Sequence, residues 1–195
     1  PWVSGTARDR EPPTTAQVHA GFRTLAAFHQ ALRRHARRGT SPDLTARHAE
    51  IIALLTGGFD RLATSLDRHS AHDLLAALAR RWLALARQLA PDLEPELRRS
   101  CGVVVPLQPC LRDMRPAHLL FEGDAVRGLI DFGAMGVETV AVDLARLSAE
   151  WLGQDRALRV EGRASYEAIR PLDAAEADLI PVFERSAALL GAGRW

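Results

Sequence analysis

The sequence predicts an α+β fold that is mainly α, because two helical regions enclose one short β-rich segment. Apolar residues recur at spacings of three and four before residue 100 and again after residue 139, which is typical of amphipathic helices. Between them, residues 102–133 combine β-branched residues with Gly turns, which is typical of short strands. A chain of 195 residues has room for one large domain or two small ones.

The N-terminal region is expected to begin with a hinge segment and to continue as a helix. Residues 1–13 are rich in Pro, Gly and charge, which indicates a hinge rather than a regular element. Thr14 or Thr15 can cap the helix that follows. Its apolar face carries Val18, Phe22, Leu25, His29 and Leu32. His29 is therefore expected to be a core histidine with a hydrogen bond.

Two further helices are expected before residue 100, over about 44–55 and 71–90. The glycine pair at 57–58 interrupts or ends the first of them, and the helix could resume after it. Pro91 and Pro95 are expected to stop the second, because proline lacks the amide hydrogen that a helix interior needs.

The second half of the chain is expected to begin with strands and to end with helices. Residues 103–109, VVVPLQP, indicate a strand. Residues 118–133 indicate two short strands around the turn Glu122-Gly123-Asp124. Helical patterns return over residues 139–152, about 157–169 and 174–190.

The overall composition excludes several classes of protein. A net charge of +1 gives no indication of a nucleic-acid or membrane surface, and no apolar run approaches the roughly 18 residues of a membrane span. Cys101 and Cys110 lack the spacing of a metal site or a disulfide framework, so we expect reduced thiols and a cytoplasmic protein. All 25 basic residues are Arg, so a mechanism that needs a lysine cannot be complete within this chain.

Three side chains that could carry chemistry surround the predicted hairpin. Asp113 lies in a polar loop after a strand, His118 follows five residues later, and Asp131 ends the return strand. Because a hairpin brings its two ends together, these side chains can converge. One carboxylate could accept a proton from a hydroxyl, and the other could hold Mg²⁺, which prefers oxygen ligands. Gly133 would let the backbone turn beside them.

Each of these residues has a simpler interpretation. A single Asp in a loop is usually a turn or cap residue. The combination is rarer by chance, because a D-x-x-x-x-H pattern, a hairpin and D-F-G follow one another, with the second Asp eighteen residues after the first.

Residues 102–147 resemble the aminoglycoside phosphotransferase and choline kinase group of the protein-kinase-like fold. The resemblance rests on LRDMRPAHLLF, GLIDFGAMG and VDLARL. FRTLAAFHQAL resembles an early helix of that family, and PWVSG resembles its hinge. The resemblance implies that residues 14–195 form the C-terminal lobe, with helices around a small catalytic β-hairpin within 102–133.

The family motifs imply a role for each matching residue. Asp113 matches the catalytic aspartate that orients the substrate hydroxyl and could deprotonate it, and Asp131 matches the metal-binding aspartate. Asp143 matches an aspartate that braces the catalytic loop, and Leu120 and Ile130 match the floor of the adenine pocket. Arg115, Phe132 and Gly133 are expected to support this site. The implied cofactor is ATP with Mg²⁺ or Mn²⁺.

The sequence departs from the family pattern at three places. Arg112 and Leu111 replace the Gly and His before the catalytic Asp, and Arg112 could pair with a phosphate, an acidic substrate or a nearby carboxylate. His118 replaces the metal-binding Asn, and imidazole suits Mn²⁺ better than Mg²⁺. No glycine-rich phosphate loop and no lysine occur, which predicts an N-terminal lobe of the same protein missing from this chain.

The function expected from the resemblance is ATP-dependent phosphoryl transfer to a hydroxyl of a small molecule. The alternative is a pseudokinase, a nucleotide- or partner-binding regulatory module that has lost catalysis, which His118 and Leu111 would favour. A purely helical interaction domain would leave the paired Asp motifs unexplained. The sequence does not identify the acceptor.

Overall fold

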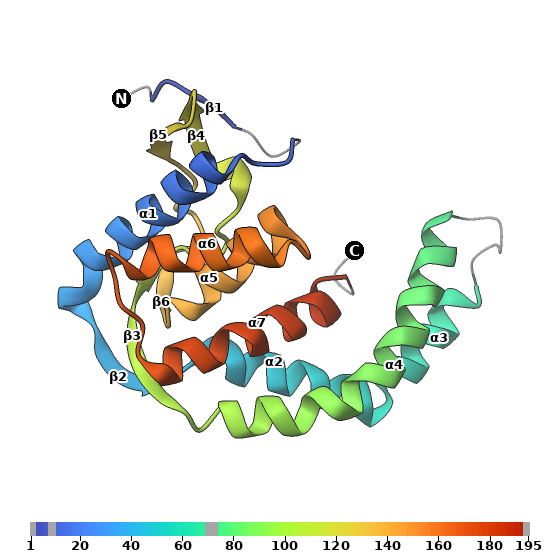
Figure 1. Cartoon of the computed structure of the whole chain (residues 1–195). Coiled ribbons are helices and arrows are strands. Elements are labelled where there is room, and N and C mark those ends of the chain that lie inside the picture. Colours follow the sequence, from blue (N-terminus) through green and yellow to red (C-terminus); the bar gives the residue numbers. More distant parts are fainter. Residues whose placement is uncertain (1–2, 8–10, 69–73, 193–195) are drawn as a thin grey trace. The chain divides into compact units, whose positions relative to one another are not determined.

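The computed structural model describes residues 3–7, 11–68 and 74–192 (Figure 1). The chain divides into two compact units. The first contains residues 1–39 and 104–180, and the second contains residues 40–103 and 181–195. Parts of the hinge segment expected over 1–13 and the beginning of the helix expected at 71 lie outside the described residues.

Helix α1 (Thr15–Leu32) begins the packing of the first unit. Thr14 caps it through a reciprocal capping box with Gln17, as the sequence predicts. Val18, Phe22, Leu25 and His29 of the expected apolar face are buried. This face packs against α6 (Arg156–Glu167), where Gly162 leaves room for the ring of Phe22.

The predicted hairpin is present and belongs to a three-stranded sheet. Strands β4 (Leu119–Glu122) and β5 (Ala125–Leu129) pair antiparallel, and Gly123 makes the turn between them with a φ of +61°. Strand β1 (Thr6–Ala7) pairs with the other edge of β4. The segment before α1 therefore contributes a strand to the sheet that contains the hairpin.

A second sheet of the first unit has the order β2 (Arg37–Thr40), β3 (Val104–Cys110) and β6 (Gly136–Glu138). The sequence predicts β3 but neither of its neighbours. In the register of this sheet Cys110 lies opposite Gly136. The first residues after β3 and the residues before β6 are the two segments that carry Asp113 and Asp131.

Short helical turns connect these strands to the C-terminal helices. Pro116–His118 forms a 3-10 turn directly before β4. Helix α5 (Ala141–Leu147) is almost wholly buried and continues as a π-helical turn over Ser148–Leu152. Helix α7 (Ala174–Ala192) follows α6. These elements agree with the three helices expected after residue 139.

The second unit contains α2 (Pro42–Ala53), a π-helical turn (Leu54–Gly58), α3 (Phe59–Leu66), α4 (Leu74–Ser100) and the C-terminal part of α7. The expected interruption at the glycine pair is confirmed, since Gly57 has a φ of +98° and the helix resumes at Phe59.

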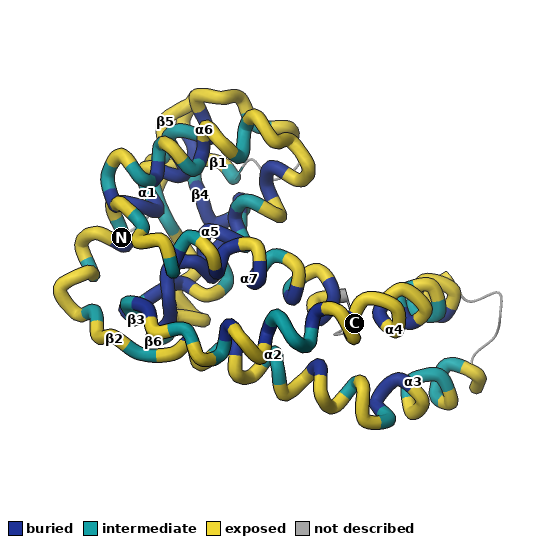
Figure 2. The backbone as a smooth tube through the Cα atoms, turned by 60° about the horizontal axis from the view of Figure 1, so that its bottom comes forward, coloured by how far each residue is buried: buried dark blue, intermediate teal, exposed yellow. Residues whose placement is uncertain are grey.

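The prediction that prolines end the third helix is wrong, because α4 continues through Pro91 and Pro95 to Ser100. Its buried side follows the helical period on both sides of the prolines, and Figure 2 shows buried positions recurring along the helix. We attribute the continuation to this packing against α2, which outweighs the lost backbone hydrogen bonds. The buried positions are Ala76, Leu83, Ala86, Ala90, Leu93, Leu97 and Ser100.

The predicted fold class, α+β and mainly α, is confirmed by this arrangement of helices with small sheets. Within the described part of the chain, every helix is too short or too polar to span a bilayer.

Candidate active site

Asp113 lies in the loop that follows β3, and its carboxylate is held by two arginines. Its Oδ1 accepts a hydrogen bond from Arg115 Nε at 3.2 Å and lies 2.8 Å from Nη2 of Arg146. The side chain of Asp113 is 38% exposed, so a ligand can reach it from solvent. The carboxylate is therefore fixed by its neighbours and still open on one side.

Glu150 extends this contact into a network of four charges. It lies 3.8 Å from Nη1 of Arg115 and 3.5 Å from Nε of Arg146. The hydrogen bond to Asp113 raises the pKa of the Arg115 guanidinium against the opposing effect of burial, and Glu150 raises it further. The two positive and two negative groups compensate one another beside the predicted base.

Sequence reasoning did not find Arg146. A signal was available, because Arg146 lies three residues after Asp143 and so shares a face of α5 with it. Glu150 follows Arg146 by one further turn of the helix. The structure shows that it meets two guanidinium groups.

His118 and Asp131 meet at the open end of the hairpin. The backbone N–H of Ile130 donates to the carbonyl of His118 at 3.0 Å, which joins the two strand ends. His118 Nε2 then lies 3.5 Å from Asp131 Oδ2. His118 is buried, whereas the Asp131 side chain is 59% exposed. The expected convergence of these two residues is present.

These two side chains fit a shared divalent cation. Two atoms that bind one Mg²⁺ or Mn²⁺ at about 2.1 Å and at right angles lie roughly 3 Å apart, which is close to the observed separation. Asp131 supplies oxygen, and neutral His118 can supply nitrogen, a donor that Mn²⁺ accepts more readily than Mg²⁺. Asp113 is connected to this pair through Arg115, whose pKa is also raised by the charge of Asp131.

The expected turn at Gly133 is present, because the N–H of Met135 donates to the carbonyl of Phe132 at 3.1 Å. Asp131 bends the backbone just before this turn. Asp131 has a φ of +62°, and its Oδ1 accepts a hydrogen bond from the Gly133 N–H at 3.3 Å. Phe132 is exposed, with its ring centroid 6.0 Å from that of Phe28 on α1. The turn thus directs the Asp131 carboxylate outward.

The residues expected to floor an adenine pocket lie on the hairpin. Leu120 is half-buried and pairs with Ala7 on one side and Gly128 on the other. Ile130 is 37% exposed. Both positions present apolar surface beside the Asp131 turn.

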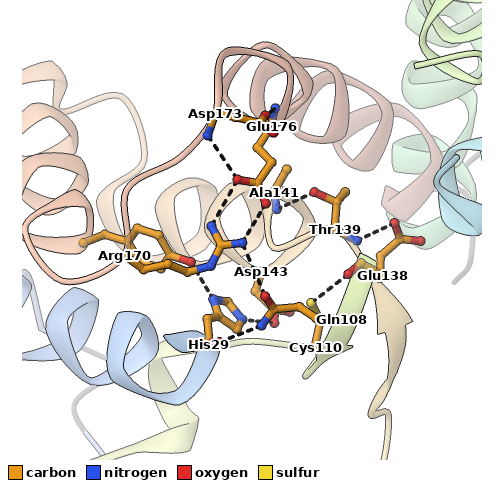
Figure 3. Close-up of polar contacts among 11 residues, drawn as sticks. His29, Gln108, Cys110, Glu138, Thr139, Ala141, Asp143, Arg170, Asp173 and Glu176 are labelled. Atoms are coloured by element: carbon orange, nitrogen blue, oxygen red, sulfur yellow. Dashed lines mark hydrogen bonds and ion pairs between the residues drawn. The ribbon is translucent and has the colours of Figure 1, made fainter. Parts of the chain in front are cut away.

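Asp143 braces the loop that carries Asp113 through two backbone hydrogen bonds. Its Oδ2 accepts from the backbone N–H of Leu111 at 2.8 Å, and its Oδ1 accepts from that of Arg112 at 2.7 Å. His29 Nε2 lies 3.0 Å from Oδ2, and Asp143 and His29 are fully buried. The other ring nitrogen of His29 lies 2.8 Å from the Tyr166 hydroxyl. Figure 3 shows His29 and Asp143 at the centre of a buried polar network.

Arg170 and Glu176 form the other half of this network (Figure 3). Both are buried, and Arg170 donates to the two carboxylate oxygens of Glu176 at 2.7 and 3.1 Å. Burial is the largest single effect and opposes the charged form of Arg170, but the hydrogen bonds to Glu176 and the charges of Glu176, Tyr166 and Cys110 together outweigh it, so the pKa of Arg170 is raised. Gln108 accepts a hydrogen bond from Arg170 and donates one to the backbone carbonyl of His29. It therefore connects the Arg170–Glu176 ion pair to the His29–Asp143 contact.

Sequence reasoning found His29 and Asp143 of this network but missed Gln108, Tyr166, Arg170 and Glu176. Tyr166 and Arg170 are four residues apart, a spacing that places both side chains on the same side of the backbone at the end of α6. Glu138 is also buried, and it accepts a hydrogen bond from the Thr139 N–H.

The sequence profile of the phosphotransferase enzyme family matches residues 1–178. The chain belongs to this family. A homoserine kinase of Brucella anthropi is 39% identical over 110 residues, which are 54% of this chain and 33% of that protein. A homoserine kinase of Azorhizobium caulinodans is 29% identical over 182 residues, which are 91% of this chain and 50% of that protein. The chain therefore spans a third to a half of the length of these two relatives.

The fold of the chain is that of a solved family structure. The aminoglycoside phosphotransferase of Alicyclobacillus acidocaldarius aligns with a TM-score of 0.53 and 23% identity. The alignment covers 97% of this chain and 60% of that one. At this identity the likeness concerns the fold alone.

The structure explains why a Gly suits the family position that Arg112 occupies here. Arg112 has a φ of +65°, a conformation that Gly adopts without steric cost. Its side chain lies against Gly136 of β6, where an added Cβ would meet its guanidinium nitrogen at 2.9 Å. Leu111, in place of the family His, is buried and contributes its backbone N–H to Asp143.

Cys110 is the last residue of β3 and lies beside His29 and Asp143. Both cysteines of the chain are free thiols. The Cys110 thiol donates to the Glu138 carbonyl at 3.2 Å. Its sulfur, a nitrogen of His29 and an oxygen of Asp143 lie within 4.8 Å of one another, a set of atoms of the kinds that bind metal ions. Both ring nitrogens of His29 and both oxygens of Asp143 already have hydrogen-bond partners, which favours a structural role.

The protonation of Cys110 should make the free energy of unfolding depend on pH. Burial raises the pKa of this thiol well above its ordinary value of 9.0, and the charges of Asp143 and Glu138 raise it further. Above about pH 9 the unfolded chain loses this proton and the folded chain keeps it. The free energy of unfolding should therefore fall, by up to about 1.4 kcal/mol per pH unit from this group.

Chemical denaturation at about pH 8, 9 and 10 measures this slope. Cys110→Ser should make it shallower, while Cys101→Ser, at a half-buried thiol, should change it less. An unchanged slope in Cys110→Ser would show that this thiol does not titrate differently in the two states.

Proposed function

We propose that the chain is the C-terminal lobe of an ATP-dependent kinase that phosphorylates a hydroxyl of a small molecule. The observation that carries the proposal is that Asp113 lies on a loop braced by Asp143 and that Arg115, which contacts Asp113, also senses the charge of Asp131 in the His118–Asp131 pair. Membership of the phosphotransferase family supports it. An N-terminal lobe of the same protein would supply the lysine and the phosphate loop that this chain lacks.

In the proposed reaction the bond between the γ-phosphorus and the bridging oxygen of ATP breaks, and a bond from this phosphorus to the acceptor oxygen forms. Asp113 orients the acceptor hydroxyl and receives its proton, and ADP leaves. Asp131 and His118 would hold the divalent cation, which neutralises phosphate charge when bound. Leu120 and Ile130 would contact the adenine ring.

The acceptor is proposed to be a small alcohol, and L-homoserine is the first candidate because the relatives are named homoserine kinases. A pseudokinase is the second candidate function. Two observations favour it, namely His118 at the metal position and the contact of both Arg115 and Arg146 with a single oxygen of Asp113.

Metal-dependent ATP binding to the full-length protein tests the proposal. We expect binding with Mg²⁺ or Mn²⁺, and we expect Asp131→Ala to weaken it more than about tenfold by removing a charged ligand. His118→Asn should shift the preference from Mn²⁺ towards Mg²⁺ if His118 binds the metal. Isothermal titration calorimetry with each metal measures both effects.

Asp124→Ala is the matched control, because Asp124 is an exposed aspartate at the opposite end of the same hairpin. It should bind ATP as the wild type does. If the folded wild-type protein binds no nucleotide with either metal, the kinase proposal fails. If it binds ATP but transfers no phosphate to any acceptor, the pseudokinase takes its place.

A further inference from the structure

The charges beside Asp113 are arranged as a receptor for a ligand that carries both signs of charge. Arg115 and Arg146 provide two guanidinium groups, and Glu150 provides a carboxylate within 3.8 Å of both. Arg146 Nη2 is only 2.8 Å from Asp113 Oδ1. A small acceptor whose hydroxyl binds to Asp113 can therefore reach all three side chains with its other polar groups.

The guanidinium of Arg146 is not fully engaged by its present neighbours. Its Nε is shielded from solvent and has no hydrogen-bond partner among the described residues. Glu150 Oε2 lies 3.5 Å from this nitrogen, an ion-pair distance without a hydrogen bond. Arg146 therefore does not form the bidentate contact with a carboxylate that its planar group favours.

These ion pairs are also weak enough to exchange. The side chains are between 33% and 43% exposed, and pairs of this kind contribute about 0–1 kcal/mol. A bidentate contact between an arginine and a ligand carboxylate is stronger, because both of its hydrogen bonds are charge-assisted. A ligand carboxylate can thus compete with Asp113 and Glu150 for the guanidinium groups.

We infer that the acceptor is a small hydroxy amino acid whose carboxylate is bound by Arg146 and Arg115 and whose ammonium group is bound by Glu150. The inference rests on the proposed function, since it takes Asp113 as the residue that receives the acceptor hydroxyl. Binding of the carboxylate draws the guanidinium groups away from Asp113 Oδ1, so this oxygen becomes available to the hydroxyl. An acceptor without a carboxylate leaves them in place.

Three acceptors separate these contacts in the full-length protein. L-Homoserine carries both charged groups, 4-hydroxybutyrate lacks the ammonium group, and 3-aminopropan-1-ol lacks the carboxylate. Arg146→Ala should raise KM about tenfold or more for the first two and change it less than about twofold for the third. Glu150→Gln should raise KM for L-homoserine and 3-aminopropan-1-ol, but not for 4-hydroxybutyrate.

Arg163→Ala is the matched control. Arg163 and Glu167 form an i,i+4 pair on α6 with side-chain exposures of 36% and 40%, close to the 33% and 39% of Arg146 and Glu150. This variant should leave all three KM values unchanged. Arg146→Lys, which keeps the charge, should recover part of the loss, and circular dichroism checks that each variant is folded.

The outcomes distinguish this inference from the proposed function. If Arg146→Ala raises the three KM values equally, or raises none, the inference is overturned while the kinase proposal stands. If the wild type transfers no phosphate but binds 4-hydroxybutyrate in calorimetry, and Arg146→Ala loses that binding, the anion site stands and the kinase proposal fails. If the wild type neither phosphorylates nor binds any of the three acceptors, the inference is wrong.

Discussion

Arg170→Met is expected to lower the free energy of unfolding by about 3–5 kcal/mol, because it leaves the Glu176 carboxylate buried without its counter-charge. Arg170 and Glu176 are 1% and 2% exposed, so water cannot replace the lost hydrogen bonds. Gln108 also loses a donor to its side-chain oxygen. Urea denaturation measured by circular dichroism gives the difference in free energy.

Two further variants show whether the cost comes from the unpaired charge. Arg163→Met removes an arginine from an exposed pair and should cost less than about 1 kcal/mol. The double variant Arg170→Met/Glu176→Gln should recover part of the stability, because the glutamine side chain is neutral. A loss in Arg170→Met no larger than that in Arg163→Met would mean that this buried pair does not stabilise the fold.

Asp113→Asn is expected to lower kcat for the acceptor by about 10²–10⁴-fold in the full-length protein, because an amide cannot accept the hydroxyl proton. Nucleotide binding should stay within about twofold of wild type, since Asp131 and His118 are unchanged. Steady-state kinetics with L-homoserine and calorimetry with ATP measure the two quantities separately.

Asp92→Asn is a suitable control, since Asp92 is an exposed aspartate on α4. Its kcat should equal that of the wild type. If Asp113→Asn retains more than a tenth of the wild-type kcat, Asp113 is not the proton acceptor of the reaction. If it loses ATP binding as well, Asp113 belongs to the nucleotide site instead.

The hairpin could be predicted from the sequence because its signals are local. Gly123 supplies the left-handed turn, and the residues on either side of it have strand propensity. The face of α1 was predictable for the same reason, since the spacing of Val18, Phe22 and Leu25 records burial along one helix. The family motifs then indicated Asp113, Asp131 and Asp143.

The remaining features depend on contacts between distant segments. Strand β2 reads Arg-Arg-Gly-Thr and has no strand pattern of its own, so its conformation depends on pairing with β3. Arg146 reaches Asp113 across 33 positions of sequence, and Arg170 reaches Gln108 across 62. The spacing of Arg146 from Asp143 indicates a shared face of α5, but no local pattern shows which of the 25 arginines reaches Asp113 or is buried. Likewise, α4 continues through two prolines because of its packing, although local rules predict that a proline ends a helix.

The backbone around the candidate site adopts an unfavourable conformation at two residues. Among the described residues, Arg112 and Asp131 alone combine a side chain with a positive φ, and they flank the loop and the turn that carry the candidate site. An L-residue in this conformation costs about 1–2 kcal/mol relative to its preferred backbone. Glycine would remove that cost at both positions and would also remove a guanidinium and a carboxylate. Stability alone would therefore favour glycine at both positions, as the family pattern has it at the position of Arg112.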